Sequence, residues 1–403
     1  MKVLILHQHF KVPHRGGAIR SYYLAKALVE KGAAVVVITA HNEGGCRKEN
    51  VEGIEVHYLP VPYDNRFGFN KRLAAFFRFV IKSVKFAAPH RDADVCYAIS
   101  TPLTTGLAAL MIRRLYKVPY IFEVGDLWPE APIEMGFIRN RLFHRPLYKL
   151  EKAIYKRAES IVALSPAIRD VIVKKISGKT VHVLPNMSDT DFFKPEEKRA
   201  ALEEKFGVNG KFVVSYIGAM GVANGLAYIL ECAKVCQDEN VPIHFLLCGD
   251  GAMVDELKRS AEELSLRNLT FVPFVNRDGV GEIMNITDAI LICYQPVKIL
   301  ETGSPNKYFD GLAAGKLTII NFGGWIKGEV EKEGCGVYVD PKEPGDFLRK
   351  VRPFMDDPVL LKKYQDAGRL LAERKYSRRI LGEKFWGLVA GSIISNMFIQ
   401  SVP

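Results

Sequence analysis

Residues 301–316 read ETGSPNKYFDGLAAGK, and this stretch places a turn, one cation and one carboxylate at the start of a predicted helix. Pro305 suits the first turn of a helix and Ser304 suits its cap, so the free backbone N–H groups there form a site that attracts anions. Lys307 adds a positive charge within that turn, and Asp310 follows about one turn later, where it can meet a hydroxylated ligand. The pattern predicts a nucleotide-sugar pocket, although an ordinary capped helix after a strand accounts for it about as well.

Short apolar segments alternate with helical patterns through both halves of the chain. The first half contains KVLIL, VVVIT, IEVHYL, VCYAIS, YIFEV, IVALS and VHVLP, and the second contains FVVSYIGA, IHFLLCGDG, LTFVPFV, AILICY, LTIIN and GVYVD. Strands separated by helices predict a parallel, doubly wound sheet that binds ligands at the carboxyl ends of its strands. Because 403 residues are too many for one ordinary core, we expect two Rossmann-like α/β domains. The predicted domains are residues 1–190 and 191–377, and a final helix occupies residues 378–403.

Glycines lie where several of these strands turn into helices. Gly16 and Gly17 follow the first strand, Gly218 and Gly221 follow FVVSYI, and Gly249 follows IHFLLC. A residue without a side chain lets main-chain N–H groups approach a phosphate closely, so the loop at 218–221 predicts a diphosphate contact. For Gly16 and Gly17 taken alone, a tight strand-to-helix turn is the better explanation. No GxGxxG run follows the first strand, which argues against a dinucleotide oxidoreductase.

A carboxylate also ends the strand YIFEV, within the run GDLWPEAP. Asp126 leaves the predicted sheet edge beside Trp128, where it can accept a proton from a sugar hydroxyl or orient that hydroxyl. The same residue could instead cap the following turn, and Glu130 is a second candidate with a weaker claim.

In this order the motifs resemble those of family 4 glycosyltransferases, which are retaining enzymes of GT-B architecture, and especially the bacterial branch that builds surface polysaccharides. The run SPNK followed by Asp310 and AAG resembles the donor-binding signature of that branch. The resemblance covers essentially the whole chain, and its other motifs are RGG at 15–17, GDLWPE at 125–130, LPN at 184–186, GAMG at 218–221 and CGDG at 248–251. It implies two Rossmann-like domains that face a central cleft, with the C-terminal helix crossing back to the first domain.

The resemblance also implies a donor site and a substrate. The donor would be a nucleoside-diphosphate sugar, UDP-linked, and the acceptor a membrane-held, polyprenyl-linked saccharide, with no other cofactor. The loop at 15–17 would line the cleft near the donor phosphates and the acceptor, and the CGDG loop would belong to the wall around the base and the ribose. The donor-binding residues that it implies are Gly16, Gly17, Gly218, Gly221, Gly249, Ser304, Asn306 and Asp310.

The sequence departs from the family pattern around the second glycine loop. The Arg and the Lys that usually flank this loop correspond here to Ala219 and Asn224. Because negative charge that develops on a leaving diphosphate needs a positioned cation or a metal ion, we expect Lys307 to supply part of the missing charge. No acidic cluster resembles a DxD-type metal site, so we expect a cation from the protein and no metal.

A second departure concerns the family's two-carboxylate motif. With Asp310 as its second acid, the first acid corresponds to Thr302, and Glu301 lies one residue away. We expect Glu301 and the backbone after Gly303 to share the contact with the sugar. The catalytic residues predicted from the sequence are therefore Asp126, Glu301 and Lys307.

Three features of the sequence indicate the cellular compartment and the possible partners: the cysteines, the N-terminal segment and the charge. The seven cysteines form no CxxC pair and most lie in apolar runs, as expected in a reducing compartment, so zinc is not expected. The start MKVLILHQHF reads as a first core strand and not as a secretion signal, which predicts a cytoplasmic protein. Residues 1–185 carry a net charge of +14, whereas residues 186–403 carry −3, so the first half alone is basic.

The basic charge is concentrated in residues 66–91, which contain seven Lys or Arg, no Asp or Glu, and many phenylalanines. A basic helix with this aromatic content favours binding to the anionic inner face of the plasma membrane. Nucleic acid would be attracted by the same charge, and a core helix with a basic solvent face is a further alternative. The uncharged residues 385–403 are marginal for a membrane span, so we expect a buried return helix there.

Two other functions fit parts of the sequence. A GT-B nucleotide-sugar epimerase would keep the fold and act on the donor alone. A basic protein that only binds RNA or membranes would explain the charge of the first half, but it leaves residues 301–316 without a purpose.

Overall fold

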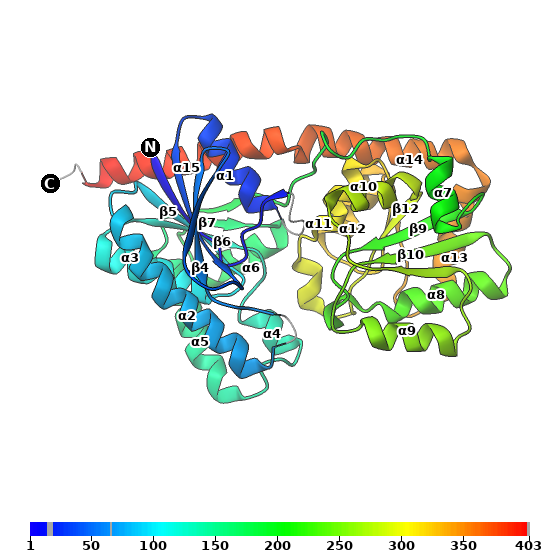
Figure 1. The fold of residues 1–403 in the computed structure, drawn as a ribbon, viewed down its shortest axis with the longest axis horizontal. Helices are drawn as coiled ribbons and strands as arrows, with labels where there is room; N and C mark the ends of the chain where they lie inside the picture. The colour runs from blue at the N-terminus through cyan, green and yellow to red at the C-terminus, as the bar shows by residue number, and fades with distance from the viewer. Residues whose placement is uncertain (14–18, 65–66, 401–403) are drawn as a thin grey trace.

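The apolar runs of the first half form one sheet in the computed structural model, which describes residues 1–13, 19–64 and 67–400 (Figure 1). The strands of this sheet are, in spatial order, β3 (Arg47–Val51), β4 (Ile54–Pro60), β2 (Ala34–His41), β1 (Lys2–Leu6), β5 (Val95–Ile99), β6 (Tyr120–Val124), β7 (Ile161–Ala163) and β8 (Val181–Val183). Neighbouring strands are parallel, except that β3 runs antiparallel to β4 at the edge. The sequence did not predict β3, because its residues RKENV show almost no apolar alternation.

Helices cover both faces of this sheet. Val3 and Ile5 of β1 face one side and Leu4 and Leu6 face the other, as the two-residue period of a strand requires. The first side is covered by α1 (Arg20–Glu30) and α15 (Arg378–Gln400). The second side is covered by α2 (Phe69–Ala87), α3 (Thr104–Tyr116), α5 (His144–Arg157) and α6 (Pro166–Lys175).

The second half forms a separate parallel sheet. Its strands are, in spatial order, β11 (Leu269–Val272), β10 (Ile243–Cys248), β9 (Phe212–Ile217), β12 (Ala289–Ile292), β13 (Leu317–Ile320) and β14 (Gly336–Tyr338). One face packs against α8 (Ala227–Asp238), α9 (Val254–Glu263) and α13 (Pro344–Asp356). The other face packs against α7 (Ala200–Phe206), α10 (Arg277–Ile286), α11 (Asn306–Ala313), α12 (Trp325–Glu333) and α14 (Pro358–Leu371). The two doubly wound sheets confirm the predicted fold class.

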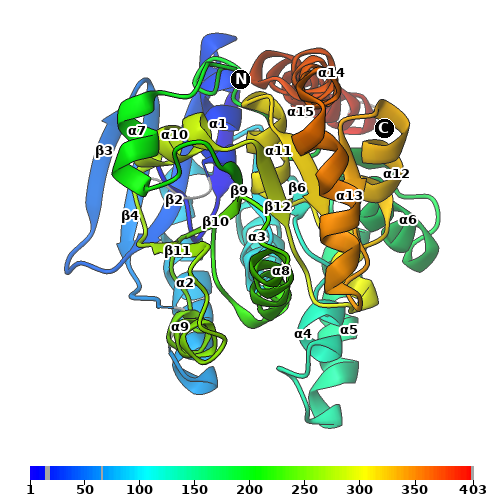
Figure 2. The same ribbon diagram turned by 90° about the vertical axis from the view of Figure 1, so that its right-hand side faces the viewer.

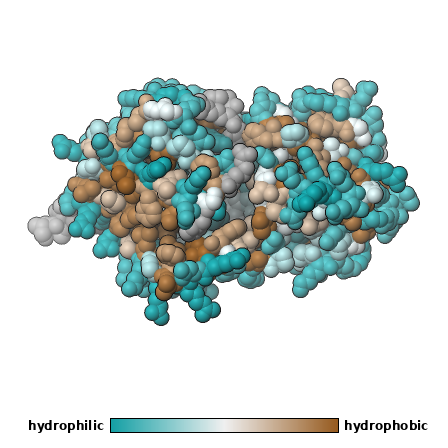
Figure 3. Space-filling view, turned by 60° about the horizontal axis from the view of Figure 1, so that its bottom comes forward, coloured by the Kyte–Doolittle hydropathy of each residue, from teal (hydrophilic) through white to brown (hydrophobic). Residues whose placement is uncertain are grey.

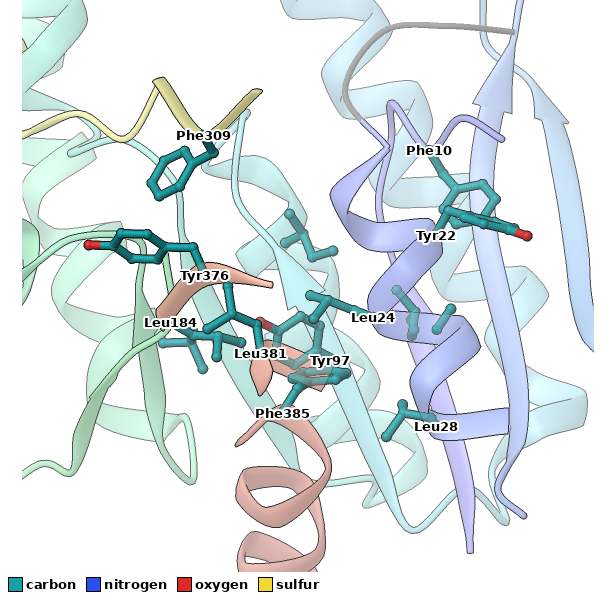
Figure 4. Close-up of a cluster of buried hydrophobic side chains, with 14 of the residues drawn as sticks. Phe10, Tyr22, Leu24, Leu28, Tyr97, Leu184, Phe309, Tyr376, Leu381 and Phe385 are labelled. Atoms are coloured by element: carbon teal, nitrogen blue, oxygen red, sulfur yellow. The ribbon is translucent and has the colours of Figure 1, made fainter. Parts of the chain in front are cut away.

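The chain passes between the two sheets twice, and the two passages lie side by side. Ser188 and Ser377 form a parallel bridge, in which the Ser188 amide donates to the Tyr376 carbonyl oxygen at 2.8 Å. Beyond this bridge, α15 returns to the first domain, where the rings of Phe385 and Tyr97 lie 4.7 Å apart (Figure 4). The predicted return of the C-terminal helix is therefore confirmed.

A buried ion pair fixes the start of α1 against the sheet. The Arg20 guanidinium donates to the Glu123 carboxylate of β6 at 2.9 Å and to the Leu184 carbonyl oxygen at 2.9 Å. The Tyr97 hydroxyl donates to the same carboxylate. These contacts join β5, β6, α1 and the LPN segment at the carboxyl edge of the first sheet.

Candidate active site

The start of α11 presents free backbone donors. The helix begins at Asn306 with Pro305 at its N-cap, and no side chain caps it. The prediction that Ser304 caps this helix is wrong, because its hydroxyl lies 3.4 Å from the Asn186 amide and its carbonyl oxygen accepts from the Asn186 side chain. Among the described residues, the N–H groups of Asn306 and Lys307 have no acceptor. Such a helix start attracts an anion.

The Lys307 side chain reaches across to the loop that follows β9. Its ammonium nitrogen donates to the Tyr216 hydroxyl at 2.8 Å and lies 3.4 Å from the Asn224 amide oxygen. It also lies 4.1 Å from the centroid of the Tyr216 ring. Within the described part of the chain, no carboxylate forms an ion pair with it, and burial lowers the pKa of Lys307 to about 8. A partly buried cation without an acidic partner can accept a charged ligand.

Two glycine loops pack against each other beside this cation. A Cβ on Gly249 would lie 1.9 Å from the Gly218 carbonyl oxygen, so the loops approach as closely as backbone allows. Gly218 has φ +145°, and a Cβ there would lie 3.2 Å from Cε of Lys307. The sequence predicted that the Gly218 amide contacts a diphosphate. In the structure this amide instead donates to the Cys248 carbonyl oxygen at 2.9 Å. The Gly221 amide has no backbone acceptor among the described residues, and its contact with a diphosphate stays a prediction.

Asp310 faces a small cavity between the two domains. The cavity has a volume of about 50 Å³ and is lined by Ile19, Arg20, Tyr23, Met187, Asp189, Arg277, Asn306 and Asp310. Burial raises the pKa of Asp310 to about 7, and the nearby Arg277 guanidinium opposes this shift. Arg277 itself pairs with the buried Asp189. Asn306 and Asp310 therefore lie at the interdomain gap, as predicted, beside a guanidinium that the sequence did not indicate.

Asp126 lies on the first-domain side of the gap, next to a tyrosine of the second domain. Its carboxylate is 3.5 Å from the Thr101 hydroxyl, and burial raises its pKa. Burial, together with the proximity of this carboxylate, raises the pKa of Tyr294. Tyr294 follows β12 and was not singled out in the sequence, because nothing in its local spacing marks it. The two residues therefore lie at the facing edges of the two sheets.

Glu301 lies in the short helix η5 (Lys298–Thr302), where it forms an ion pair with a lysine of the same helix. Its carboxylate pairs with Lys298 at 2.6 Å and lies against Gly323, whose Cβ would be 3.2 Å from Oε1. The Thr302 carbonyl oxygen accepts from the Ser165 hydroxyl at 2.6 Å, which joins this turn to the first domain. The contact of Glu301 with the sugar stays a prediction.

Some predicted positions fall elsewhere. Gly16 and Gly17 lie outside the described residues. Glu130 pairs with Lys175 and lies in α4 (Glu130–Glu134), next to the Asp126 loop. In the described part of the chain, the one group of three side chains that could hold a metal ion is Glu55, His57 and His90, in β4 and just after α2 rather than among the site residues above.

Two family models match consecutive parts of the chain. The model described as glycosyl transferase 4-like domain matches residues 15–187, and the model described as glycosyl transferases group 1 matches residues 198–371. The boundary between these matches falls at the first passage between the two sheets.

Individual proteins are similar over much of their length. The Pseudomonas aeruginosa protein named probable glycosyltransferase WbjE is 22% identical over 82% of this chain and 82% of its own. WcaI of Escherichia coli (strain K12), provisionally named a colanic acid biosynthesis glycosyl transferase, is 23% identical over 60% of this chain and 59% of its own. The structure of Anabaena HepE in complex with UDP-glucose superposes with a TM-score of 0.71, at 17% identity, over 97% of this chain and 100% of that one. Because the two models together match most of the chain and the fold agrees, the chain belongs to the family 4 glycosyltransferases of GT-B architecture.

Proposed function

We propose that the protein is a retaining, metal-independent hexosyltransferase that moves a sugar from a UDP-linked donor to a polyprenyl-linked saccharide during surface polysaccharide synthesis. The observation that carries this proposal is the Lys307 ammonium group, which has no carboxylate partner among the described residues and belongs to the helix whose first amides, those of Asn306 and Lys307, are free. A cation and free amides that come from the start of one helix are suited to a diphosphate. The UDP-glucose in HepE and the colanic acid in the name of WcaI support the donor and product classes.

In the proposed reaction, the second domain holds the donor. Lys307 and the α11 amides stabilise the negative charge that develops on the leaving diphosphate. The ionised Asp310 carboxylate accepts hydrogen bonds from the ribose hydroxyls, and Glu301 contacts the sugar. Binding energy from the nucleotide positions the anomeric carbon for attack.

The first domain supplies the acceptor side. Asp126 orients the acceptor hydroxyl by accepting a hydrogen bond from it, and burial raises the pKa of this carboxyl group. Because Glu301 is paired with Lys298 and Asp310 lies beside Arg277, we assign neither carboxylate as a covalent nucleophile. We propose a front-side displacement instead. The bond from C1 to the phosphate oxygen breaks, the acceptor oxygen bonds to C1 on the same face, and the acceptor proton passes to a phosphate oxygen.

The proposed place of this reaction is the cytoplasmic face of the plasma membrane, where a polyprenyl-linked acceptor is accessible. None of the helices in the described part of the chain combines the length and hydropathy that a bilayer-spanning segment requires. We infer peripheral attachment from the basic residues 66–91 and from the membrane-held acceptor.

Nucleotide release tests the proposal. The protein is incubated with UDP-hexoses, with and without extracted polyprenyl-linked saccharides, and free nucleotide is measured. We expect release that depends on acceptor, apart from slow hydrolysis, and a melting temperature that rises with the logarithm of donor concentration above its dissociation constant. Interconversion of the donor sugar without acceptor would support the epimerase. No stabilisation by any nucleotide sugar, together with salt-dependent RNA binding, would support the non-enzymatic alternative.

A further inference from the structure

An exposed turn on the first domain displays large apolar side chains to solvent. We call residues 137–149 the tip; it contains the short helix η3 (Arg141–Phe143) and the start of α5. The exposed fractions of its apolar residues are 51% for Phe137, 80% for Leu142 and 52% for Phe143. Solvation of such side chains is unfavourable, so a turn that presents several together is suited to contact with an apolar phase.

Hydrogen bonds within the tip and to the adjoining Gly136 hold it in this shape. The Leu142 amide donates to the Asn140 side chain at 3.0 Å, and Nε of Arg139 donates to the Gly136 carbonyl oxygen at 3.1 Å. His144 lies 3.0 Å from the Ile138 carbonyl oxygen. The apolar side chains therefore point outward from a turn with its own internal bonds.

The charge of the tip selects among possible partners. Residues 135–150 contain four Lys or Arg and no Asp or Glu. Arg139, Arg141, Arg145 and Lys149 are all exposed. Cations next to exposed leucine and phenylalanine match a bilayer with anionic headgroups, because the acyl region takes the apolar groups and the phosphates take the charges. Nucleic acid would use the cations but leave the apolar side chains in water.

The outer side of α2 repeats this pairing of apolar and basic residues. Leu73, Phe77 and Ile81 are spaced four residues apart and are 39%, 46% and 67% exposed. The exposed surface of α2 also carries a basic row, Lys71, Arg78 and Lys85, spaced by seven residues. We call these six residues the α2 stripe. Lys82, which the sequence placed in the same patch, instead donates to the Pro60 carbonyl oxygen at 3.0 Å.

The tip and the α2 stripe lie on the same side of the molecule. Figures 1 and 2 show α2 and the start of α5 both projecting from the lower side of the first domain. Figure 3, in which this side comes forward, shows brown apolar surface among teal hydrophilic groups over that domain. A flat bilayer can therefore touch both at once.

This side also leads directly to the candidate acceptor residue. The chain runs from Asp126 through α4 into the tip, and α4 contacts η5 of the second domain. We propose that the tip and the α2 stripe dock together on an anionic bilayer, with Leu142 and Phe143 inserted at the acyl boundary and α2 lying along the headgroups. The docking itself does not depend on the proposed function. Only its consequence does, namely that docking holds the Asp126 loop near a lipid-linked acceptor.

Vesicle co-sedimentation of the full chain tests the docking without any assay of activity. We use phosphatidylcholine vesicles with and without phosphatidylglycerol. We expect L142S/F143S to lower the partition onto the anionic vesicles about tenfold or more, because the insertion of two large side chains is lost. The control V359S/L370S changes two apolar residues of α14 that are 80% and 59% exposed, and it should bind as the wild type does. The proposal is overturned if the tip variant binds like the wild type, or if the control loses as much binding.

Two further variants separate insertion from charge. Phe143→Trp should be quenched by brominated acyl chains in anionic vesicles, whereas Val359→Trp should not be, and quenching of neither or of both contradicts insertion. K71Q/R78Q/K85Q should bind the anionic vesicles less than the wild type does, and this difference should increase with the phosphatidylglycerol content. Binding of homopolymeric RNA that depends on the tip, without binding of vesicles, would also overturn the proposal.

Turnover distinguishes this docking from the glycosyl transfer itself. We expect L142S/F143S to act normally on a short-chain, water-soluble acceptor and to lose activity on an acceptor in vesicles. No transfer to either acceptor by the wild type would refute the proposed function, while the vesicle result would still stand. Equal loss on both acceptors would refute the link between the tip and acceptor delivery.

Discussion

The Lys307 ammonium nitrogen lies 2.8 Å from the Tyr216 hydroxyl oxygen and 4.1 Å from the centroid of the same ring. The hydroxyl in turn donates to the Ala219 carbonyl oxygen at 2.6 Å. In most members of the family, an Arg and a Lys that flank the glycine loop supply the positive charge there. In this chain, a lysine of α11 lies at the same loop.

The first prediction concerns this displaced charge. Lys307→Ala should lower kcat/KM about 10²- to 10³-fold, because one positioned donor to the leaving group is lost. Asn224→Lys in the same protein should restore part of the loss, since Oδ1 of Asn224 lies 3.4 Å from the Lys307 ammonium nitrogen. Steady-state kinetics and calorimetric titration with UDP measure both effects. Near-normal turnover by the single variant would remove Lys307 from the reaction.

The second prediction is a narrow pH optimum. Lys307 binds an anion only when protonated, and burial places its pKa at about 8. Asp310 accepts hydrogen bonds from two hydroxyls only when ionised, and burial places its pKa at about 7. We therefore expect kcat/KM to fall below about pH 7 and above about pH 8. Asp310→Asn should remove the acid limb and leave the alkaline limb, and a profile that this variant does not change would contradict the assignment.

The third prediction separates the acceptor side from the donor side. Asp126→Asn keeps the size of the side chain but removes the negative charge that orients the acceptor hydroxyl, so transfer should fall about 10²-fold while UDP affinity stays unchanged. Nucleotide release with acceptor and calorimetric titration of UDP measure the two quantities. Equal losses in both would place Asp126 at the donor or in folding rather than at the acceptor.

The fourth prediction concerns stability. Glu123→Ala leaves the buried Arg20 guanidinium without its carboxylate and should lower the free energy of unfolding by about 3–5 kcal/mol. The double variant R20M/E123L should lose less than E123A, because it leaves no buried charge unpaired. The exposed pair Lys234–Asp238 is the control, and its removal should cost about 1 kcal/mol or less. Chemical denaturation measures all three, and a loss for E123A no larger than that of the control would contradict the prediction.

The sequence predicted the elements that depend on local patterns. The SPNK run placed Lys307 and Asp310 on one short helix, because helix starts and their charges are read over a few residues. The cap at Ser304 was wrong because its oxygens serve Asn186, which lies 118 residues earlier. No local pattern could reveal that contact.

The residues that the sequence missed come together only in the fold. Tyr216, Arg277 and Tyr294 each follow or end a different strand, and the parallel sheet brings those strand ends to one edge. Their spacing along the chain follows no pattern from which this proximity could be predicted. The exposed tip was also missed as an apolar surface, because the exposure of Leu142 and Phe143 is known only from the structure.

Both connections between the domains meet at the bridge of Ser188 and Ser377. The other contacts between the domains, such as that of Ser165 with Thr302, are non-covalent, so rotation of the domains about this crossing displaces most the parts of the gap that lie furthest from it. Figure 1 shows this crossing on the upper side, with α4 and the start of α5 on the lower side. Swinging the domains apart would thus widen the gap most beside α4, on the side that carries the tip.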